Sequence, residues 1–180
     1  MFFSQEHYKK TKKYLFQTAL YKYLAFFEFR YLKNNGDMPL GLRYIAMQHG
    51  PVPQEIYENR ANPSFFSLVT FVPGTSKDGK TSYIVKPHGR FNEDYFSIAE
   101  IEEMNHLIEI FSQKWIGTGV MSDASHQEIK AWRKTFSQKP NQFIDPIEEF
   151  DRDITGVSQE ELRTEELKYL MRRKMEELAE

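Results

Sequence analysis

The sequence predicts a mainly α fold, consisting of a compact helical domain with one small antiparallel β-hairpin and a C-terminal amphipathic helix. Apolar residues recur at helical spacing within segments 18–33, 98–115 and 158–180. Serine followed three residues later by glutamate, the pattern of a capping box, marks several helix starts. Two β-rich runs flank a turn-rich segment at 73–80. The hydrophobic content of 40%, which includes 15 Phe and 10 Tyr, is sufficient for a large core.

The N-terminal part of the chain contains two expected helices. Ser4 is placed to cap the first, which reaches about Tyr14. Thr18 is placed to cap the second, which runs to Lys33 and stops at Gly36. In the second helix, apolar residues at intervals of four, three and four occupy one face, and aromatic residues occupy the others. A helix that is apolar on nearly all sides belongs at the centre of a fold.

A sharp corner between two short helices is expected next. Gly50 can adopt the left-handed backbone conformation that ends a helix. Pro51 prevents that helix from continuing, and Pro53 fits the first turn of the following one. We therefore expect helices at Leu42–Gln48 and Gln54–Arg60, with the angle between them fixed by this elbow.

The middle of the chain predicts a hairpin followed by a longer helix. The β-rich runs Phe65–Val72 and Thr81–Lys86 should pair around a polar tip. Ser97 and Glu100 form a capping box ahead of an amphipathic helix. The apolar stripe of that helix comprises Ile101, Met104, Leu107, Ile108, Phe111 and Trp115.

Short helices are expected in the segment that follows. Thr118 is placed to cap one that ends near Ser122. Ser125 begins a second capping box, which leads into a helix containing Trp132. Asp145, followed by proline, opens a short acidic helix.

A terminal helix, capped by Ser158 and Glu161, carries an apolar stripe that must be covered. Packing on its own domain, pairing with a second copy as a homodimer and capture of a partner protein all remain open. Methionine in the stripe suits an adaptable contact surface. The candidate partner-binding residues are Leu167, Leu170, Met171, Met175 and Leu178.

Charge is unevenly distributed along the chain, although the net charge is −2. Residues 1–43 hold eight Lys or Arg against three acids, whereas residues 141–180 hold twelve acids against six bases. Such an uneven distribution of charge bears on the binding partners of a protein more than on its fold. We divide the chain into a helical domain at 1–140, with its hairpin at about 65–86, and an acidic link with the C-terminal helix at 141–180.

Composition also narrows the functional classes. The chain has no cysteine, which excludes disulfides, thiolate catalysis and cysteine-ligated zinc. No apolar run approaches the roughly 20 residues that a membrane span requires. The N-terminus lacks the charged start and apolar run of a secretion signal. We therefore expect a cytoplasmic protein without a membrane partner.

The titratable residues do not form a recognisable catalytic, metal or cofactor site. The histidines are scattered and form no HExxH pattern. His49 is expected to bond carbonyl groups at a helix end and His126 to orient a helix cap. Adjacent acids on a helix point about 100° apart and do not converge on one substrate. The five histidines are His7, His49, His88, His106 and His126.

A basic segment near the N-terminus raises the question of nucleic-acid binding. Lys9–Lys13 contains four lysines and is flanked by Tyr8 and Tyr14, a combination that can contact phosphates and stack on bases. The acidic character of the whole chain argues against this role, since lysines on one helix usually form a solvated face. We therefore expect no nucleic-acid partner.

Two blocks of the sequence occur in a characteristic order. The first comprises a helix at Tyr21–Phe29 of the type K-L-L-Y-F-A-D-F, a glycine-containing turn, and Tyr44–Tyr57 of the type Y-x-A-x-x-x-G-P-V-P with a following tyrosine. The second is Val120–His126 with Trp132. Together, from about residue 12 to residue 136, they resemble the Panacea antitoxin domain, which includes SocA-like antitoxins and phage-associated GepA-like proteins. The family-motif residues here are Tyr44, His49, Gly50, Pro51, Val52, Pro53, Tyr57, Ser125, His126 and Trp132.

The resemblance implies an antitoxin that binds and neutralises a cognate toxin protein, in some relatives as an adapter for a protease. It also implies a prophage or another mobile element as the genetic setting. The motif residues would then build the scaffold, and the partner would contact its exposed ends, the hairpin tip or the terminal helix. A DNA-binding transcriptional regulator of a mobile element is the alternative. An enzyme would require convergent polar side chains that the sequence does not display.

Overall fold

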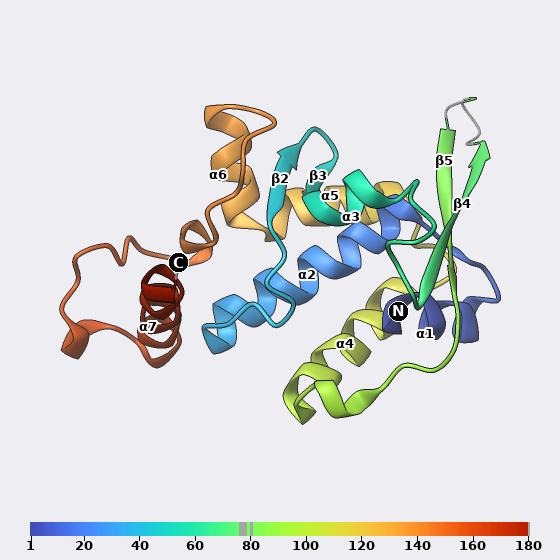
Figure 1. Ribbon diagram of the computed structural model, residues 1–180. Helices are drawn as coiled ribbons and strands as arrows, with labels where there is room; N and C mark the ends of the chain where they lie inside the picture. The colour runs from blue at the N-terminus through green and yellow to red at the C-terminus, as the bar shows by residue number, and fades with distance from the viewer. Residues whose placement is uncertain (76–78, 80, 180) are drawn as a thin grey trace.

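The computed structural model describes residues 1–75, 79 and 81–179, and the elements gather around one long helix, α2 (Figure 1). The expected mainly α class is confirmed. The α-helices are α1 (Phe2–Thr11), α2 (Gln17–Asn35), α3 (Gln54–Asn59), α4 (Ile98–Phe111), α5 (Thr118–Glu128), α6 (Lys130–Gln138) and α7 (Thr164–Ala179). The strands are β1 (Leu15–Phe16), β2 (Tyr44–Met47), β3 (Gly50–Pro53), β4 (Val69–Thr75) and β5 (Thr81–Pro87). The 3₁₀ helices are η1 (Glu93–Tyr95), η2 (Pro146–Glu149) and η3 (Gln159–Glu161).

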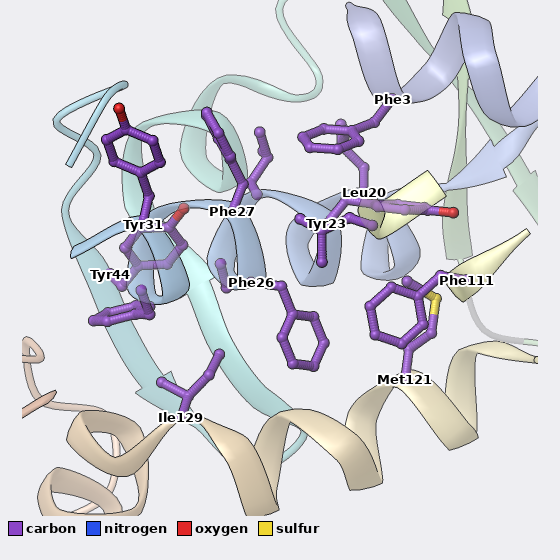
Figure 2. Packing of buried hydrophobic residues seen from close by; sticks show 14 of the residues in the cluster. Phe3, Leu20, Tyr23, Phe26, Phe27, Tyr31, Tyr44, Phe111, Met121 and Ile129 are labelled. Atoms are coloured by element: carbon purple, nitrogen blue, oxygen red, sulfur yellow. The ribbon is translucent and has the colours of Figure 1, made fainter. Parts of the chain in front are cut away.

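Helix α2 forms the centre of the core, as its all-round apolar character predicts. Every residue from Ala19 to Phe29 is buried, and Tyr23 and Phe27 expose no surface. Helices α1, α4, α5 and α7 and strand β3 contact it. Figure 2 shows the aromatic side chains that pack along this helix. The helix ends where expected, because Gly36 adopts a φ of 69° and its N–H donates to the carbonyl of Leu32 at 2.8 Å.

The segment predicted to form a corner between helices is a β-hairpin instead. Strands β2 and β3 pair antiparallel, with Met47 opposite Gly50, so that the two residues between them form the turn. The helix expected at Leu42–Gln48 is therefore wrong, whereas α3 follows Pro53 as expected. Gly50 does adopt a positive φ, of 105°, but it closes a hairpin rather than a helix.

Pairing on both edges explains why β2 is a strand. One edge pairs with β3. On the other edge, Ala46 donates its N–H to the carbonyl of Gln142 and accepts the N–H of Asn141, both at 2.8 Å. The N–H of Ile144 donates to the carbonyl of Tyr44 at 2.9 Å. These partners lie far away in the sequence, so local patterns do not reveal them.

Pro51 and Pro53 suit their places in β3. Hydrogen-bonded and non-hydrogen-bonded pairs alternate along antiparallel strands. Proline has no N–H, so the hydrogen-bonded positions in β3 are Gly50 and Val52, and both proline nitrogens face away from β2. Both prolines are buried. They therefore leave no N–H group unpaired inside the protein.

The second sheet has the strand order β1-β5-β4. Strands β4 and β5 form the expected antiparallel hairpin, which projects from the domain in Figure 1. Strand β4 continues to Thr75, into the stretch predicted as a turn, and residues 76–78 and 80 of the predicted tip lie outside the described residues. Strand β1, which the sequence does not predict, pairs Leu15 with Val85 on the other edge of β5.

The capping predictions for Ser97, Ser4 and Ser125 have different outcomes. The Ser97–Glu100 capping box is present at the start of α4. Ser4 lies inside α1, which already begins at Phe2. Ser125 lies inside α5, where its hydroxyl donates to the carbonyl of Ser122 at 2.7 Å. A serine hydroxyl can bond the carbonyl of the preceding turn as readily as it caps a helix, so spacing alone does not separate the two roles.

Other helix boundaries also differ from expectation. Helix α5 contains Thr118, which was expected to cap it, and extends past Ser122 to Glu128. Helix α2 begins at Gln17, directly after β1, so Thr18 is inside the helix rather than at its cap. Helix α4 ends at Phe111, and Trp115 lies beyond it with 74% of its surface exposed. The chain makes a tight turn there, with the N–H of Ile116 bonded to the carbonyl of Gln113 at 3.0 Å.

The C-terminal segment contains one confirmed cap and one shifted helix start. Asp145 accepts the N–H of Ile147 at 3.1 Å and opens η2, as expected. Ser158 instead precedes η3, and α7 begins at Thr164. The physical reason is Glu166, whose carboxylate reaches back across the first turn of α7.

The start of α7 lies directly against the end of α2. A Cβ atom on Gly36 would lie 2.8 Å from the carbonyl carbon of Glu165 and even closer to its oxygen. The buried carboxylate of Glu166 accepts the N–H of Arg163 at 2.8 Å and two hydrogen bonds from Arg152, at 3.1 and 2.7 Å. Close backbone packing and a partly buried ion pair therefore fix the start of α7.

Replacement of Gly36 by alanine tests this contact. The variant combines backbone strain at positive φ, about 1–2 kcal/mol, with a clash against the Glu165 backbone. We expect Gly36→Ala to lower the free energy of unfolding by about 3 kcal/mol or more in urea titrations.

Gly41 provides the matched control, because its φ is 60° and a Cβ there would meet nothing within 4 Å. Gly41→Ala should lower the free energy of unfolding by the backbone strain alone, about 1–2 kcal/mol. Equal losses in the two variants would contradict the close packing of α7 on α2.

Candidate interaction site

Most of the motif residues meet where β3 lies between α2 and α5. Gly50 on β3, Ser125 on α5 and Trp132 on α6 are buried. His126 is half-buried, and His49 is exposed in the β2–β3 turn. Contacts of β3 with both helices, and of α5 with α6, bring these residues together. The neighbouring motif residues of the hairpin are Pro51, Val52 and Pro53.

The closest approach in this cluster is at Gly50. Lys22 of α2 and Ser125 of α5 both reach this glycine. A Cβ atom there would lie 2.6 Å from the Ser125 hydroxyl oxygen and still closer to the Lys22 ammonium nitrogen. Its φ of 105° is also one that L side chains rarely adopt. The backbone conformation therefore requires glycine, and a side chain there would displace Lys22 and Ser125.

Lys22 is a charged residue placed inside the core. It has 1% of its surface exposed. Because burial penalises the charged form, the pKa of Lys22 is lowered to about 7. The folded protein therefore favours a neutral amine at this position once the pH exceeds about 7.

Three aromatic rings stack beside the hairpin turn. The imidazole of His126 lies 4.2 Å from the Trp132 ring, centroid to centroid, and Trp132 lies 4.9 Å from Phe136. The indole N–H of Trp132 donates to the carbonyl of Met47 at 3.0 Å. Burial, and then the charge of Lys22, lower the pKa of His126. The stack therefore connects α5 and α6 to the end of β2.

The motif residue Tyr44 lies deeper in the fold, beside Glu28. Its ring packs on Phe29 with 5.3 Å between centroids. The fully buried carboxylate of Glu28 accepts the N–H groups of Leu40 and Leu42, at 2.7 and 3.2 Å. Burial outweighs these hydrogen bonds and raises the pKa of Glu28 to about 7. This group therefore holds the loop that precedes β2 against α2.

The motif residue Tyr57 belongs to a separate cluster between α2, α3 and β5. The guanidinium carbon of Arg60 lies 3.8 Å from the centroid of the Tyr57 ring and 5.5 Å from that of Tyr83. The Tyr21 ring lies 6.5 Å from that of Tyr57. Burial raises the pKa of the Tyr21 hydroxyl. A cation stacked on aromatic rings thus attaches α3 to the sheet.

Two polar residues of the motif cluster lie inside the protein. Ser125 and Lys22 have 0% and 1% of their surface exposed, and the Ser125 hydroxyl is occupied by the carbonyl of Ser122. Within residues 1–75, 79 and 81–179, no group of three or more His, Asp or Glu side chains is arranged to hold a metal ion. None of the helices in that part of the chain is long and apolar enough to cross a bilayer.

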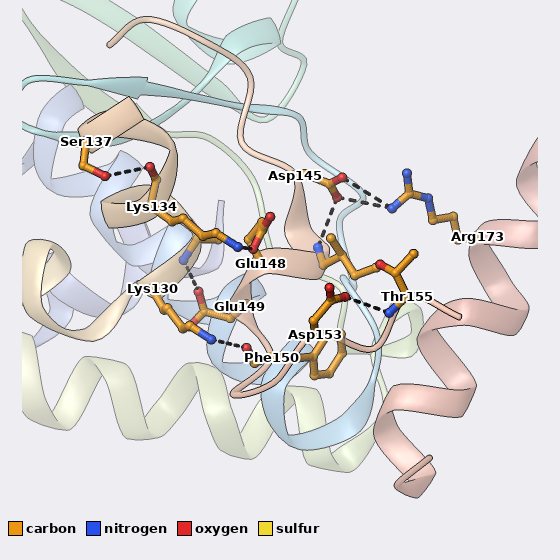
Figure 3. Close-up of polar contacts among 12 residues, drawn as sticks. Lys130, Lys134, Ser137, Asp145, Glu148, Glu149, Phe150, Asp153, Thr155 and Arg173 are labelled. Carbon is orange, nitrogen blue, oxygen red and sulfur yellow. Dashed lines mark hydrogen bonds and ion pairs between the residues drawn. The ribbon is translucent and has the colours of Figure 1, made fainter. Parts of the chain in front are cut away.

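Sequence reasoning missed three buried charged residues that organise this region: Lys22, Glu28 and Glu149. The carboxylate of Glu149 accepts the N–H of Ala131 at 2.9 Å at the start of α6 (Figure 3), and burial raises its pKa to about 7. A lysine and a glutamate inside the aromatic run of α2 were a usable signal, because such residues are rarely buried without a specific contact. Glu149 lies in an acidic segment that resembles a solvated helix, so its burial had no local signal.

The residues predicted to bind a partner on α7 do not share one environment. Leu167 and Leu170 are half-buried, and Leu170 packs against the core. Met171, Met175 and Leu178 are exposed. The terminal stripe is therefore covered by its own domain at one edge and open along most of its length.

Comparison with known families identifies the shared part of the chain. The family model of the antitoxin SocA-like Panacea domain matches residues 20–133, more than half of the chain. The chain belongs to the SocA-like Panacea antitoxin family. The expected resemblance is thus confirmed. Searches of curated proteins and of solved structures found no match.

The Panacea match assigns the described elements to two groups. It extends from Leu20 in α2 to Arg133 in α6 and so includes the hairpin β2–β3, the Gly50 cluster, and His126 and Trp132 of the aromatic stack. Helix α7 lies outside it. The match therefore covers the Gly50 cluster but not α7.

Replacement of Lys22 by methionine tests the buried amine. The pKa of Lys22 is about 7 in the folded state against 10.5 for a free lysine, so the unfolded chain binds more protons between these values. The stability of the unmodified protein should therefore rise with pH above about 7. Lys22→Met should remove about 1–2 kcal/mol of this rise between pH 7 and 9 in urea titrations.

Lys9→Met is the matched control, because the Lys9 side chain is 64% exposed. This substitution should leave the pH dependence of the free energy of unfolding unchanged. A Lys22→Met variant whose stability rises with pH as steeply as that of the unmodified protein would contradict the buried-amine account.

Proposed function

We propose that this chain is an antitoxin that binds and neutralises a cognate toxin protein by direct contact, without catalysing a reaction. The observation that carries the proposal is the family match over residues 20–133, which contains both motif blocks. Inside that match, Ser125 is buried and its hydroxyl is bonded to the carbonyl of Ser122. The motif residues thus support a contact surface rather than a catalytic cleft.

We assign the toxin contact to the face formed by the β2–β3 turn and its neighbours on α5 and α6. Gln48 and His49 are exposed at the turn, and His126 is partly exposed. The bond from Trp132 to the carbonyl of Met47 holds the turn in place. A turn that is already ordered loses little conformational entropy on binding, which favours affinity.

Neutralisation by this protein can take two forms, occlusion of the toxin surface or delivery of the toxin to a protease. We favour the first because a rigid contact face suffices for it. The half-life of the toxin distinguishes them: the antitoxin leaves it unchanged in the first and shortens it in the second. The proposal places both proteins in the cytoplasm and their genes together on a prophage or another mobile element.

A DNA-binding regulator is the alternative function, and the basic segment of α1 is its only motivation. Lys9 pairs with Glu6 at 2.5 Å, and Lys10 pairs with Glu109. Two of the four lysines are thus partly neutralised. A weak, salt-sensitive contact is the most that such a segment supports, and we therefore favour the antitoxin.

Co-expression with the product of the neighbouring gene tests the proposal. The unmodified chain should restore growth of cells that the neighbouring product alone arrests. His49→Glu places a new charge on the exposed turn and should weaken binding about tenfold or more, as measured by titration calorimetry of the purified pair.

His106→Glu is the matched control, since His106 is exposed on α4, away from the turn. It should bind and rescue normally. A neighbouring product that is harmless by itself would remove the antitoxin proposal. Normal toxin binding by His49→Glu would contradict the assignment of the toxin contact to the β2–β3 turn, but not the antitoxin role.

A further inference from the structure

Helix α7 turns much of its polar side toward the domain. Glu166 is buried against Arg152, and Arg173 pairs with Asp145 at 3.3 Å (Figure 3). Tyr169 adds an aromatic contact on the same side. A helix that docked for burial of its apolar stripe alone would be rotated by about half a turn.

The opposite side of α7 is apolar and open. Leu167, Met171, Met175 and Leu178 fall within an arc of about 80° at 100° per residue. Met171, Met175 and Leu178 have 56%, 69% and 79% of their surface exposed. The shallow groove along this stripe is lined by residues of α7 alone. The described part of the chain therefore leaves most of this stripe open.

We propose that a second copy of this chain covers the stripe, through an antiparallel pair of α7 helices. A twofold interface uses the same patch twice and must therefore be self-complementary. The stripe meets this condition because its order, Leu167, Met171, Met175 and Leu178, is Leu–Met–Met–Leu in either direction. With the twofold axis near Arg172, leucine meets leucine and methionine meets methionine. The flexible methionines adjust to small errors in register.

The charges beside the stripe select the antiparallel arrangement. Lys168 lies near the N-terminal end of one flank and Glu176 near its C-terminal end. In an antiparallel pair, Lys168 of one copy lies beside Glu176 of the other, at both ends of the interface. In a parallel pair, one flank of each helix lies beside the opposite flank of its partner, so Lys168 and Glu176 would not meet.

The size of the stripe sets the strength of the dimer. From Leu167 to Leu178 the helix rises about 16 Å. A single pair of helices of this length buries less than the roughly 1,200 Å² of a standard stable interface. The dimer should therefore be weak and dissociate at micromolar concentrations. This inference concerns a helix outside the Panacea match and does not depend on the toxin.

Sedimentation equilibrium of the full chain tests the dimer. Over about 1–300 µM, a range chosen for an interface of this size, the unmodified protein should pass from monomer to dimer. Met171→Glu combined with Met175→Glu should remain monomeric throughout while its circular dichroism is unchanged. Tyr95→Glu combined with Ile98→Glu alters two residues that are 83% and 80% exposed elsewhere, and this control should still dimerise.

Disulfide trapping tests the direction, because the chain has no cysteine of its own. An equimolar mixture of the Leu167→Cys and Leu178→Cys variants, oxidised in air, should form mainly the mixed disulfide. A parallel pair would form the two homodisulfides instead and would overturn the proposal.

Two other results would overturn it as well. They are an unmodified protein that stays monomeric at the highest concentration, and a dimer that survives both glutamate substitutions. A monomer whose toxin binding is lost in the double glutamate variant would assign the stripe to the toxin instead of a second copy.

Discussion

The contact of the β2–β3 hairpin with α2 at Gly50 is the constraint on which the arrangement of this protein depends. The glycine lies against Lys22 and Ser125, at a φ of 105°, where a side chain would have neither room nor a relaxed backbone. That approach brings β3 between α2 and α5. It also places the end of β2 where Trp132 can bond the carbonyl of Met47 at 3.0 Å.

Buried charges complete this arrangement at some energetic cost. Glu28 holds the loop before β2, Glu149 caps α6, and Lys22 fills the space beside the hairpin. Burial shifts the pKa of each toward about 7, so all three favour their neutral forms more than exposed groups would. Hydrophobic residues would be cheaper to bury, and these polar groups instead fix one specific arrangement of loops and helices. A well-defined contact face is what the proposed antitoxin role requires of this scaffold.

Local signals in the sequence were sufficient for some elements and not for others. Helix α2 with its stop at Gly36, the β4–β5 hairpin and the capping box at Ser97 follow from neighbouring residues alone, and all are present. Glycine followed by proline ends a helix or closes a hairpin equally well, so the corner at Gly50 was misassigned until its distant pairing partners were known. Several of the motif residues named from the sequence lie together around Gly50, but Lys22, which also reaches that glycine, was not among them. The orientation of α7 depends on partners such as Asp145, which no periodicity discloses.

The most direct test of the central constraint is a double-mutant cycle between Gly50 and Ser125, measured by urea unfolding. Gly50→Ala should lower the free energy of unfolding by about 3 kcal/mol or more. The decrease should be clearly larger than that of Gly89→Ala, because Gly89 has a φ of 69° and a Cβ there would meet nothing within 4 Å. In a Ser125→Gly background the cost of Gly50→Ala should fall by about 1 kcal/mol, because one clashing atom is absent. If Gly50→Ala costs no more than Gly89→Ala, and if the two substitutions are additive, the hairpin does not depend on this approach and the account is wrong.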